Sequence, residues 1–467
     1  MTRLRIDNLA HVVTVDDEFT VLDDATIEID DGIITALHGR PHGELLRHAE
    51  DVTSRRNNRA TSNRVRDAED VVVVDGRGKL ALPGLVNLHT HLPMTLLRGL
   101  AENVDLQGFL RIVWAAEGAV MDHDTVRLGA ELGAVESLLG GVTTTLDMYF
   151  HHEAAHEGAS AAGLRHVIGP VFFDGPGPDG LAWEERIAGL QAWPGRLHAM
   201  GGPTVPAAAM PHSTYTCSPE HLAEIAEVVA AWDAVRRLVH VHASENAAEN
   251  ADVVARHGAS PTQVLAAAGL LDGTAVLGHG VHLDATDIAM ATGHGGVAVA
   301  HCPGSNLKLA SGALPWQAYA AAGLRCGLGT DGCASSNDLD LWQVMRLAAL
   351  LARLTSGDAT AALAVDIVRA ATIEGARALG MDDLIGSIEV GKRADLILLD
   401  LEQPHLTPVH DIAALLVFAA GRGDVTDAFV DGRQVVQDRR STLIDTCDLL
   451  ERARERGLVA AKAARDT

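Results

Sequence analysis

The sequence predicts an α/β protein, a (β/α)8 TIM-type barrel with a small β-sandwich domain formed from both chain termini. Two observations lead to this prediction. Short apolar runs alternate with Ala-, Leu- and Glu-rich stretches of helical spacing through the middle of the chain, and strands that alternate with helices form parallel sheets. Histidines and an aspartate stand where several of these runs end, at the edge where such barrels place their functional residues.

Eight apolar runs are the predicted barrel strands. Eight β/α units over about 250 to 300 residues fit such a barrel, which we place at residues 83–382. The runs span residues 84–91, 143–149, 165–173, 208–214, 238–244, 275–280, 296–302 and 326–331.

The two flanks of the barrel read as short β segments separated by turn residues. Residues 1–82 and 383–440 are therefore expected to combine into one small β domain. Within the first flank, residues 39–70 are polar and rich in Arg and Asn, which predicts a surface insertion. Residues 441–467 predict a C-terminal helical tail.

Composition narrows the classes of partner. The 467 residues carry a formal net charge of −25, so phosphates are repelled and we expect neither a nucleic-acid nor a membrane partner. No apolar stretch reaches the roughly 18 residues that span a bilayer, and the first residues lack a signal-peptide core. The five cysteines are scattered and never spaced as CxxC, which favours a reducing, cytoplasmic setting.

A pair of histidines in "GLVNLHTH" points to a metal site. His89 and His91 stand two residues apart, so on a strand both side chains face the same way. Neutral imidazole is the commonest metal ligand. A metal site therefore explains this pair at a strand end better than two histidines buried in the core would. His242 in "VHVHASEN" is a third candidate ligand and Asp331 in "CGLGTDG" a fourth. Such a donor set suits one divalent ion, zinc first, with iron or manganese as alternatives.

Two further residues could act on a water beside that ion. Glu245 follows His242 by three residues and could take a proton from the water and pass it to a leaving group. His279 ends the apolar run "AVLGHG" and could hydrogen-bond the water or the substrate, or bind metal weakly. Since a bound metal lowers the pKa of water toward about 7, the combination predicts hydrolytic chemistry.

Neighbouring classes fit less well. The small zinc deaminases combine H-x-E with P-C-x-x-C, which neither "HCPGSN" nor "TYTCSPEH" supplies. A two-metal barrel would need a bridging Lys or Glu at the fourth strand end, where "AAMPHST" offers His212 instead. The chain also lacks a GxGxxG or GxxxxGKS loop for nucleotide cofactors.

Seven segments together resemble the amidohydrolase superfamily, most closely its branch of 5-methylthioadenosine/S-adenosylhomocysteine deaminases and chlorohydrolases. The resemblance implies that His89, His91, His242 and Asp331 bind the metal, that Glu245 is the general acid/base, and that His279 polarises or orients the attacking water. The segments are "PGLVNLHTHLPMTLLRGLAE", "MPHSTYTCSPEHL", "VHASEN", "GHGVHL", "AHCPGSNLKLASGALP", "GTDGCASSNDLDLWQVMRLAALL" and "GSIEVGKRADLILLDL".

The same resemblance suggests substrate contacts. His212 matches a substrate-contacting histidine, and Glu117 matches a glutamate that holds ribose hydroxyls in nucleoside deaminases. Phe109 stands where those enzymes commonly have Trp. Gly169 and Pro170 stand where they often carry a substrate-contacting arginine, and Arg165 is the neighbouring candidate for that contact.

The implied reaction is the hydrolytic removal of an amine from a small aminated heterocycle. The metal-activated water attacks the ring carbon, Glu245 protonates the adjacent ring nitrogen, Asp331 takes the water's proton, and ammonia leaves. We expect an adenine-type nucleoside such as adenosine, 5'-methylthioadenosine or S-adenosylhomocysteine as substrate, and, as is common in this family, a homo-oligomer. Alternatives are a guanine or pterin deaminase, a chloro- or alkylamino-triazine hydrolase, and a silent paralogue, which the complete ligand set disfavours.

Overall fold

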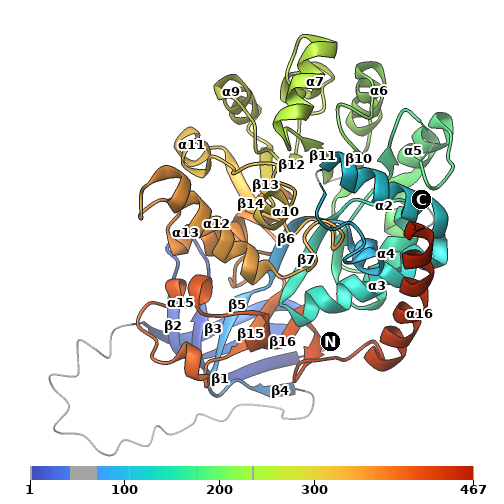
Figure 1. The fold of residues 1–467 in the computed structure, drawn as a ribbon. Helices are drawn as coiled ribbons and strands as arrows, with labels where there is room; N and C mark the ends of the chain where they lie inside the picture. Colours follow the sequence, from blue (N-terminus) through green and yellow to red (C-terminus); the bar gives the residue numbers. More distant parts are fainter. Residues whose placement is uncertain (1–2, 43–70, 105, 176, 234–235, 466–467) are drawn as a thin grey trace, which may run out of the picture.

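The computed structural model describes residues 3–42, 71–104, 106–175, 177–233 and 236–465 (Figure 1). It is an α/β structure in which helices surround parallel strands, and a separate sheet lies at one end. Most of the expected insertion, residues 43–70, lies outside the described residues. Residues 39–41 belong to strand β3 (Ile33–Pro41), so the sheet extends further than the polar composition suggested.

The central strands are parallel and follow the predicted order. They pair as β6-β7-β8 and as β14-β13-β12-β11-β10-β9, and each of the eight predicted runs overlaps at least one of them. Their bounds are β6 (Leu85–Thr90), β7 (Val142–Asp147), β8 (Arg165–Val167), β9 (Val171–Phe172), β10 (Ala207–Pro211), β11 (Arg237–Ala243), β12 (Ala275–His279), β13 (Val297–His301) and β14 (Arg325–Leu328).

The third run is interrupted, which the sequence reading missed. Strands β8 and β9 flank Gly169 and Pro170. Pro170 has no N–H to donate to a ladder, and a Cβ at Gly169 would lie 1.7 Å from the carbonyl oxygen of Ala208. The Pro170 carbonyl still accepts a hydrogen bond from Met210 N at 2.9 Å, so the interrupted run remains beside β10.

Helices connect these strands, and several begin at side-chain caps. Asp122 accepts from Thr125 N at the start of α3, and Asp340 accepts from Trp342 N at the start of α12, which satisfies amides that a helix leaves free. The segments are η1 (Leu92–Leu97), α2 (Leu106–Val120), α3 (His123–Leu139), α4 (His152–Ala161), α5 (Trp183–Met200), α6 (Pro219–Ala230), α7 (Ala247–His257), α8 (Pro261–Ala267), α9 (Ala285–Gly293), α10 (Pro303–Lys308), α11 (Trp316–Ala322), α12 (Leu341–Ser356), α13 (Ala364–Ala370), α14 (Ile373–Ala378), η2 (Pro404–Leu406), α15 (Ile412–Phe418) and η3 (Arg422–Asp424).

Strands from both flanks of the parallel-strand region form one sheet. The order is β18-β17-β16-β15-β5-β1-β2-β3, and β4 pairs with β1. These described strands make one continuous hydrogen-bonded sheet, and a sandwich of two sheets stays a prediction. The bounds are β1 (Arg3–Val13), β2 (Val21–Asp30), β4 (Val71–Asp75), β5 (Lys79–Pro83), β15 (Leu396–Asp400), β16 (Val425–Val430), β17 (Arg433–Gln437) and β18 (Arg440–Ser441).

Strand β15 joins two hydrophobic cores. Ile397 and Leu399 belong to the large core of the parallel strands and helices, whereas Leu396 and Leu398 belong to a smaller core that also contains Phe429. Successive side chains of a strand point to opposite faces, so β15 buries both of its faces. This explains why its sequence, "LILLD", is a continuous apolar run rather than an alternating one.

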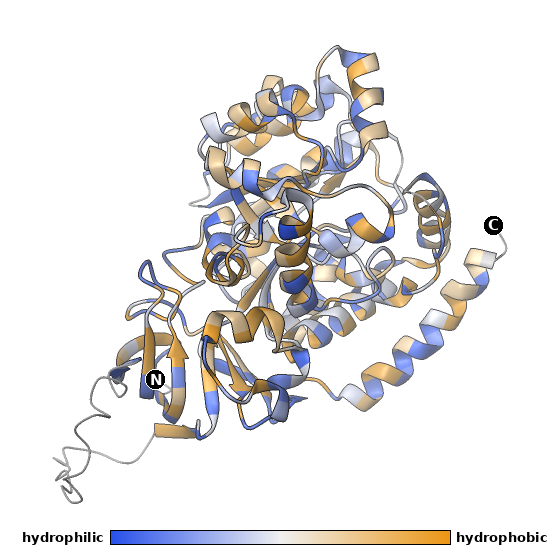
Figure 2. Ribbon diagram, turned by 60° about the vertical axis from the view of Figure 1, so that its left-hand side comes forward, coloured by the Kyte–Doolittle hydropathy of each residue, from blue (hydrophilic) through white to orange (hydrophobic). Residues whose placement is uncertain are grey.

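The predicted tail is helix α16 (Thr446–Arg465), which packs on α2 and α3 (Figure 1). Arg456 donates to Thr125 Oγ1 at 2.6 Å and to the Val120 carbonyl at 3.0 Å, so α16 braces the end of α2. Figure 2 shows hydrophilic and hydrophobic residues mixed along α16. Among the described helices, none combines the length and the apolar character needed to cross a membrane.

Candidate active site

The predicted metal ligands converge at one edge of the parallel strands. His89 lies in β6, His91 directly after it, His242 in β11, His279 at the end of β12, and Asp331 after β14. All five residues are buried. Ligand atoms of the first three lie within 4.8 Å of one another, and so do those of His89, His279 and Asp331. Parallel strands therefore bring together residues separated by up to about 240 positions, because their carboxyl ends share an edge.

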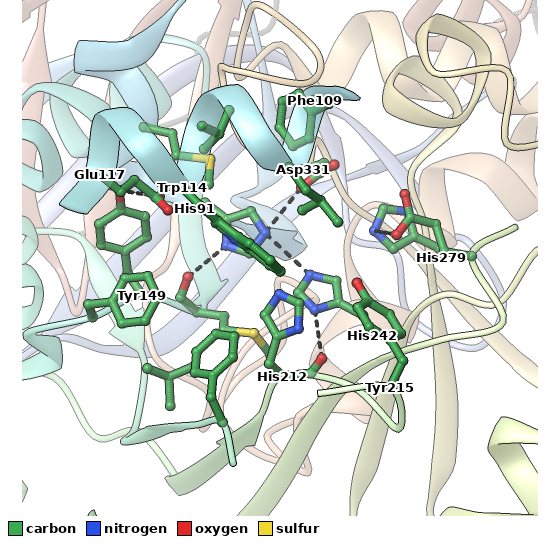
Figure 3. A pocket seen from close by; sticks show the side chains of 18 of the residues that line it. His91, Phe109, Trp114, Glu117, Tyr149, His212, Tyr215, His242, His279 and Asp331 are labelled. Carbon is green, nitrogen blue, oxygen red and sulfur yellow. Dashed lines mark hydrogen bonds and ion pairs between the residues drawn. The ribbon is translucent and has the colours of Figure 1, made fainter. Parts of the chain in front are cut away.

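Backbone carbonyls fix the tautomers of His91 and His242. The Met148 carbonyl accepts a hydrogen bond from His91 Nδ1 at 2.6 Å, and the His212 carbonyl accepts one from His242 Nδ1 at 2.8 Å. A carbonyl can only accept, so each Nδ1 carries the proton and each Nε2 presents a lone pair. The two Nε2 atoms lie 3.4 Å apart (Figure 3), an arrangement that a shared cation stabilises.

His89 is held in the same tautomer, with its proton on Nδ1, by a second histidine. The Val276 carbonyl accepts from His240 Nδ1 at 2.9 Å, which leaves His240 Nε2 as an acceptor for His89 Nδ1 at 2.7 Å. His89 Nε2 is consequently a lone pair that is buried and has no hydrogen-bond partner within the described structure. An unpaired buried polar atom is costly, so this nitrogen is arranged for a ligand that the chain does not itself supply.

Asp331 adds a carboxylate to the three nitrogens. Its Oδ1 lies 3.4 Å from His89 Nε2 and 3.2 Å from His91 Nε2. Gly332 N donates to Oδ1, and Ser335 Oγ donates to Oδ2, at 2.7 Å each. Burial alone would raise the pKa of Asp331, but the two histidines hold it well below its usual range. Three imidazoles and one carboxylate are a donor set that could hold a divalent metal ion.

Glu245 and His279 lie beside these ligands as a buried acid/base pair. Glu245 Oε2 is 3.9 Å from His279 Nε2, and Glu249 fixes the loop by accepting from Glu245 N at 2.7 Å. Burial raises the pKa of Glu245, against the opposing effect of His279. Asn306 Oδ1 accepts from His279 Nδ1 at 2.9 Å and so aims His279 Nε2 toward Glu245. The pair can therefore exchange a proton with a group that lies next to the metal ligands.

The rest of the pocket is mainly aromatic and apolar. Phe109, Trp114 and Glu117 enter it from α2, while Tyr149 and His212 enter from strand ends. Figure 3 shows Glu117 and Tyr149 on one side, His279 on the other, and the metal-ligand histidines between them.

Glu117 is fixed within this pocket. Tyr149 donates its hydroxyl to Glu117 Oε1 at 2.6 Å, and burial raises the pKa of Glu117 to about 7 although that hydrogen bond opposes the shift. The carboxyl group is therefore held in place and titrates near neutrality.

Arg165 lies elsewhere, and the prediction that it contacts substrate is wrong. It is the first residue of β8, at the strand end remote from the pocket, and it is fully buried. Its guanidinium donates to both carboxylate oxygens of Asp395, at 2.7 and 2.9 Å, and to the Thr204 carbonyl. These contacts tie the parallel strands to the start of β15, and they leave the guanidinium committed to the fold.

The structure also brings in residues that sequence reasoning missed. The other nine predicted site residues do gather at or around one pocket. In the sequence, Asn306 and Ser335 lie inside longer motifs, and Tyr149 is the last residue of an apolar run. A polar or aromatic residue at the end of a predicted parallel strand was the available signal for Tyr149. Trp114 had no such signal, because its role depends on how α2 lies across the pocket.

Comparison with known proteins gives a family match and named relatives. Residues 80–435 match the family model of the amidohydrolase family. A 5-methylthioadenosine/S-adenosylhomocysteine deaminase from Haloarcula marismortui is 38% identical over 413 residues, which cover 86% of this chain and 94% of that protein. One from Symbiobacterium thermophilum is 40% identical over 398 residues, with 84% and 88% covered.

Solved structures show the same relationship. An adenosine deaminase from Xanthomonas campestris with bound zinc superimposes with a TM-score of 0.87 and 34% identity, covering 100% of this chain and 99% of that one. Given this structural match, the family model that spans most of the residues, and the relatives near 40% identity, the chain belongs to the amidohydrolase family.

Proposed function

We propose that this protein is a zinc-dependent deaminase of adenine-type nucleosides, such as adenosine, 5'-methylthioadenosine or S-adenosylhomocysteine. The observation that carries the proposal is the set of buried imidazole lone pairs around Asp331, with Glu245 beside it and Glu117 in the same pocket. The names of the relatives at 38% and 40% identity support the nucleoside class, and the zinc-bound adenosine deaminase supports the metal.

The ion would be held by His89, His91, His242 and Asp331. A divalent ion in such a site acts as a Lewis acid and lowers the pKa of water toward about 7, which supplies a nucleophile at neutral pH. The carbonyls of Met148 and His212 and the side chain of His240 hold the imidazoles in place and direct their Nε2 atoms toward the ion. Ser335 likewise holds the aspartate in place.

Protons are moved by the residues next to these ligands. Glu245, whose pKa is raised by burial, protonates the ring nitrogen adjacent to the carbon that water attacks. Asp331 accepts one proton of the attacking water and returns it to the departing amine, and Glu245 takes back the remaining hydroxyl proton as the ring carbonyl forms. His279, aimed by Asn306, orients the water. The ring amine and one water become a ring carbonyl and ammonia, so no redox partner is required.

Substrate orientation is assigned to the opposite side of the pocket. Glu117, held by Tyr149, accepts hydrogen bonds from ribose hydroxyls, and a carboxylate suits two neighbouring hydroxyls well. His212 and Phe109 line the space between Glu117 and the metal ligands. Phe173 packs against the His212 ring at a centroid distance of 4.6 Å, which fixes that ring for contact with the base.

Ammonia release from the zinc-loaded protein tests the proposal. The substrates are adenosine, 5'-methylthioadenosine and S-adenosylhomocysteine, with guanine, a pterin and an aminotriazine as alternatives, and Glu245→Gln is the matched control. We expect ammonia from the adenine nucleosides and a loss of about 100- to 10,000-fold in kcat in the variant, with its zinc content unchanged. Turnover of a free base or a triazine alone would assign a neighbouring branch of the family.

The architecture implied by the family belongs to the same proposal. We propose that residues 83–382 close into a (β/α)8 barrel, with residues 1–82 and 383–440 as the second domain. The hydrogen bond from Asp331 N to the His89 carbonyl, 3.0 Å long, supports closure, since it joins the last and first strand ends. The homo-oligomer and the cytoplasmic setting stay predictions of the sequence.

A further inference from the structure

A second hollow, which the proposed chemistry does not use, adjoins the active-site pocket. Trp114, Phe150 and Phe173 line both spaces. The other described residues around the hollow, which measures about 450 Å³, are Gly118, Gly175, Gly177, Pro178 and Thr216. Among the described residues that line either space, none is a lysine or an arginine.

A bound nucleoside would point its 5' end into this hollow. This step rests on the proposed function, which puts the base at Glu245 and the ribose at Glu117. Trp114 and Glu117 are three residues apart on α2, so they are neighbours on one helix face. Trp114 is 40% exposed and forms a wall common to the pocket and the hollow. A substituent that extends beyond the ribose therefore passes Trp114 and enters the hollow.

Arg186, a buried cation next to the hollow, is paired with a carboxylate. Arg186 lies behind Gly177, where a Cβ would come within 2.7 Å of its guanidinium. That guanidinium donates to both carboxylate oxygens of Asp179, and also to the Val171 carbonyl at 2.9 Å. Arg186 is only 3% exposed. A bidentate, buried pair of this kind is costly to break, so Arg186 does not serve as an anchor for a substrate carboxylate.

The carboxylate next in sequence to the wall of the hollow belongs to Asp174. Asp174 precedes Gly175 and accepts from Ser218 N at 2.9 Å and from His221 Nδ1 at 2.7 Å. Its side chain is 41% exposed. The amino group of a zwitterionic substituent could face Asp174, but the carboxylate of that substituent meets no cation on the described walls. Size does not decide between substituents, since a hollow of this volume admits both a methylthio group and an amino-acid chain.

We infer that the enzyme selects adenine nucleosides whose 5' substituent is small, uncharged or apolar, and that it discriminates against the amino-acid chain of S-adenosylhomocysteine. Aromatic walls gain from covering an apolar methylthio group. The same walls remove water from a carboxylate without giving it a partner, and an unpaired charge is disfavoured in such a place. The discrimination arises at the 5' end and leaves the deamination chemistry unchanged.

The test compares kcat/KM for 5'-methylthioadenosine and S-adenosylhomocysteine on the zinc-loaded full chain. We expect a ratio of at least about 100 in favour of the methylthio compound, equivalent to about 2.7 kcal/mol of transition-state stabilisation. A ratio near one, or one that favours S-adenosylhomocysteine, overturns the inference while the proposed function stands. Failure of every adenine nucleoside to release ammonia would instead reject the proposed function, and the inference with it.

A cation designed into the hollow tests whether the absence of positive charge causes the discrimination. Gly118 lies on α2 at the hollow, and an added Cβ meets no atom within 4 Å, so Gly118→Arg places a guanidinium there, with Gly118→Gln as the uncharged control. We expect the arginine to shift the kcat/KM ratio toward S-adenosylhomocysteine by about tenfold or more and the glutamine to leave it within about twofold. Equal shifts in both variants would contradict the electrostatic cause. Gly175→Arg, also in open space, repeats the test from the other wall.

Discussion

Two buried charged clusters lie at opposite ends of the parallel strands, and they differ in whether the chain completes them. At the remote end, Arg165 is matched by both oxygens of Asp395 and by the Thr204 carbonyl. At the pocket end, His89 Nε2 has no hydrogen-bond partner among the described residues, and Nε2 atoms of His91 and His242 face each other at 3.4 Å. A complete cluster holds a fold together, whereas an incomplete one is built for a ligand.

The largest expected effect comes from breaking the incomplete cluster. His242→Ala removes one of three imidazoles from the metal site, and we expect kcat/KM to fall by at least about 1,000-fold because the nucleophile depends on the ion. Zinc per chain, measured by mass spectrometry after dialysis, should fall from one toward zero. A variant that keeps one zinc and more than a tenth of the activity would show that His242 is not a ligand.

Breaking the complete cluster should instead weaken the fold. Arg165→Met leaves the Asp395 carboxylate buried without its partner, so we expect the free energy of unfolding to fall by about 3–5 kcal/mol. The folded variant should retain one zinc and its kcat. Urea denaturation gives the stability, and the double variant Arg165→Met/Asp395→Leu, which removes both charges, should recover part of the loss. A change in KM with unaltered stability would return Arg165 to the substrate site.

Asn306, which contacts no charged group of either cluster, separates an effect on catalysis from effects on metal binding and stability. Asn306→Ala removes the acceptor that aims His279, and supporting residues of this kind are worth about 10- to 100-fold. We therefore expect kcat to fall by that factor while zinc content and stability change little. Asn306→Asp retains an acceptor oxygen and should restore most of the rate. Loss of zinc in Asn306→Ala would place His279 among the metal ligands.

The smallest expected effect concerns a histidine that is buried outside both clusters. Burial and the neighbouring His166 lower the pKa of His156 to about 3, whereas an unfolded histidine has a pKa of about 6.5. Between these values the unfolded chain binds one proton more, so stability falls as the pH drops, by at most about 1.4 kcal/mol per pH unit. His156→Gln should reduce this slope in urea denaturation at about pH 7, 6 and 5. Identical slopes in His156→Gln and in the parent protein would contradict the low pKa of His156 in the folded state.

The sequence could predict the incomplete cluster because each member stands next to an apolar run. His89 and His91 share a face by strand periodicity, and Asp331 ends the eighth run. Arg165 also lies in such a run, but at its start, and its partner Asp395 is 230 residues away in the sequence. No local sequence pattern predicts that Arg165 pairs with Asp395. The interruption at Gly169 and Pro170 was likewise hidden, since it depends on how closely β10 approaches.

The walls of the second hollow were equally hard to predict from the sequence. Trp114 lies on a helix with ordinary apolar spacing, and nothing in that spacing says which face meets the pocket. Gly118 and Gly175 carry no side chain to signal a role. A site built from strand ends is thus readable from periodicity, whereas a site built from helix faces and loops depends on packing that only the folded structure reveals.

The position of β5 in the composite sheet has a consequence for synthesis of the chain. β5 pairs with β1 on one side and with β15 on the other, yet more than 300 residues separate β5 from β15. While the ribosome makes the intervening segment, the second edge of β5 stays without its strand, and uncovered strand edges invite pairing with other chains. Completion of the sheet is thus one of the last events of translation, and a chain released early would carry an open edge.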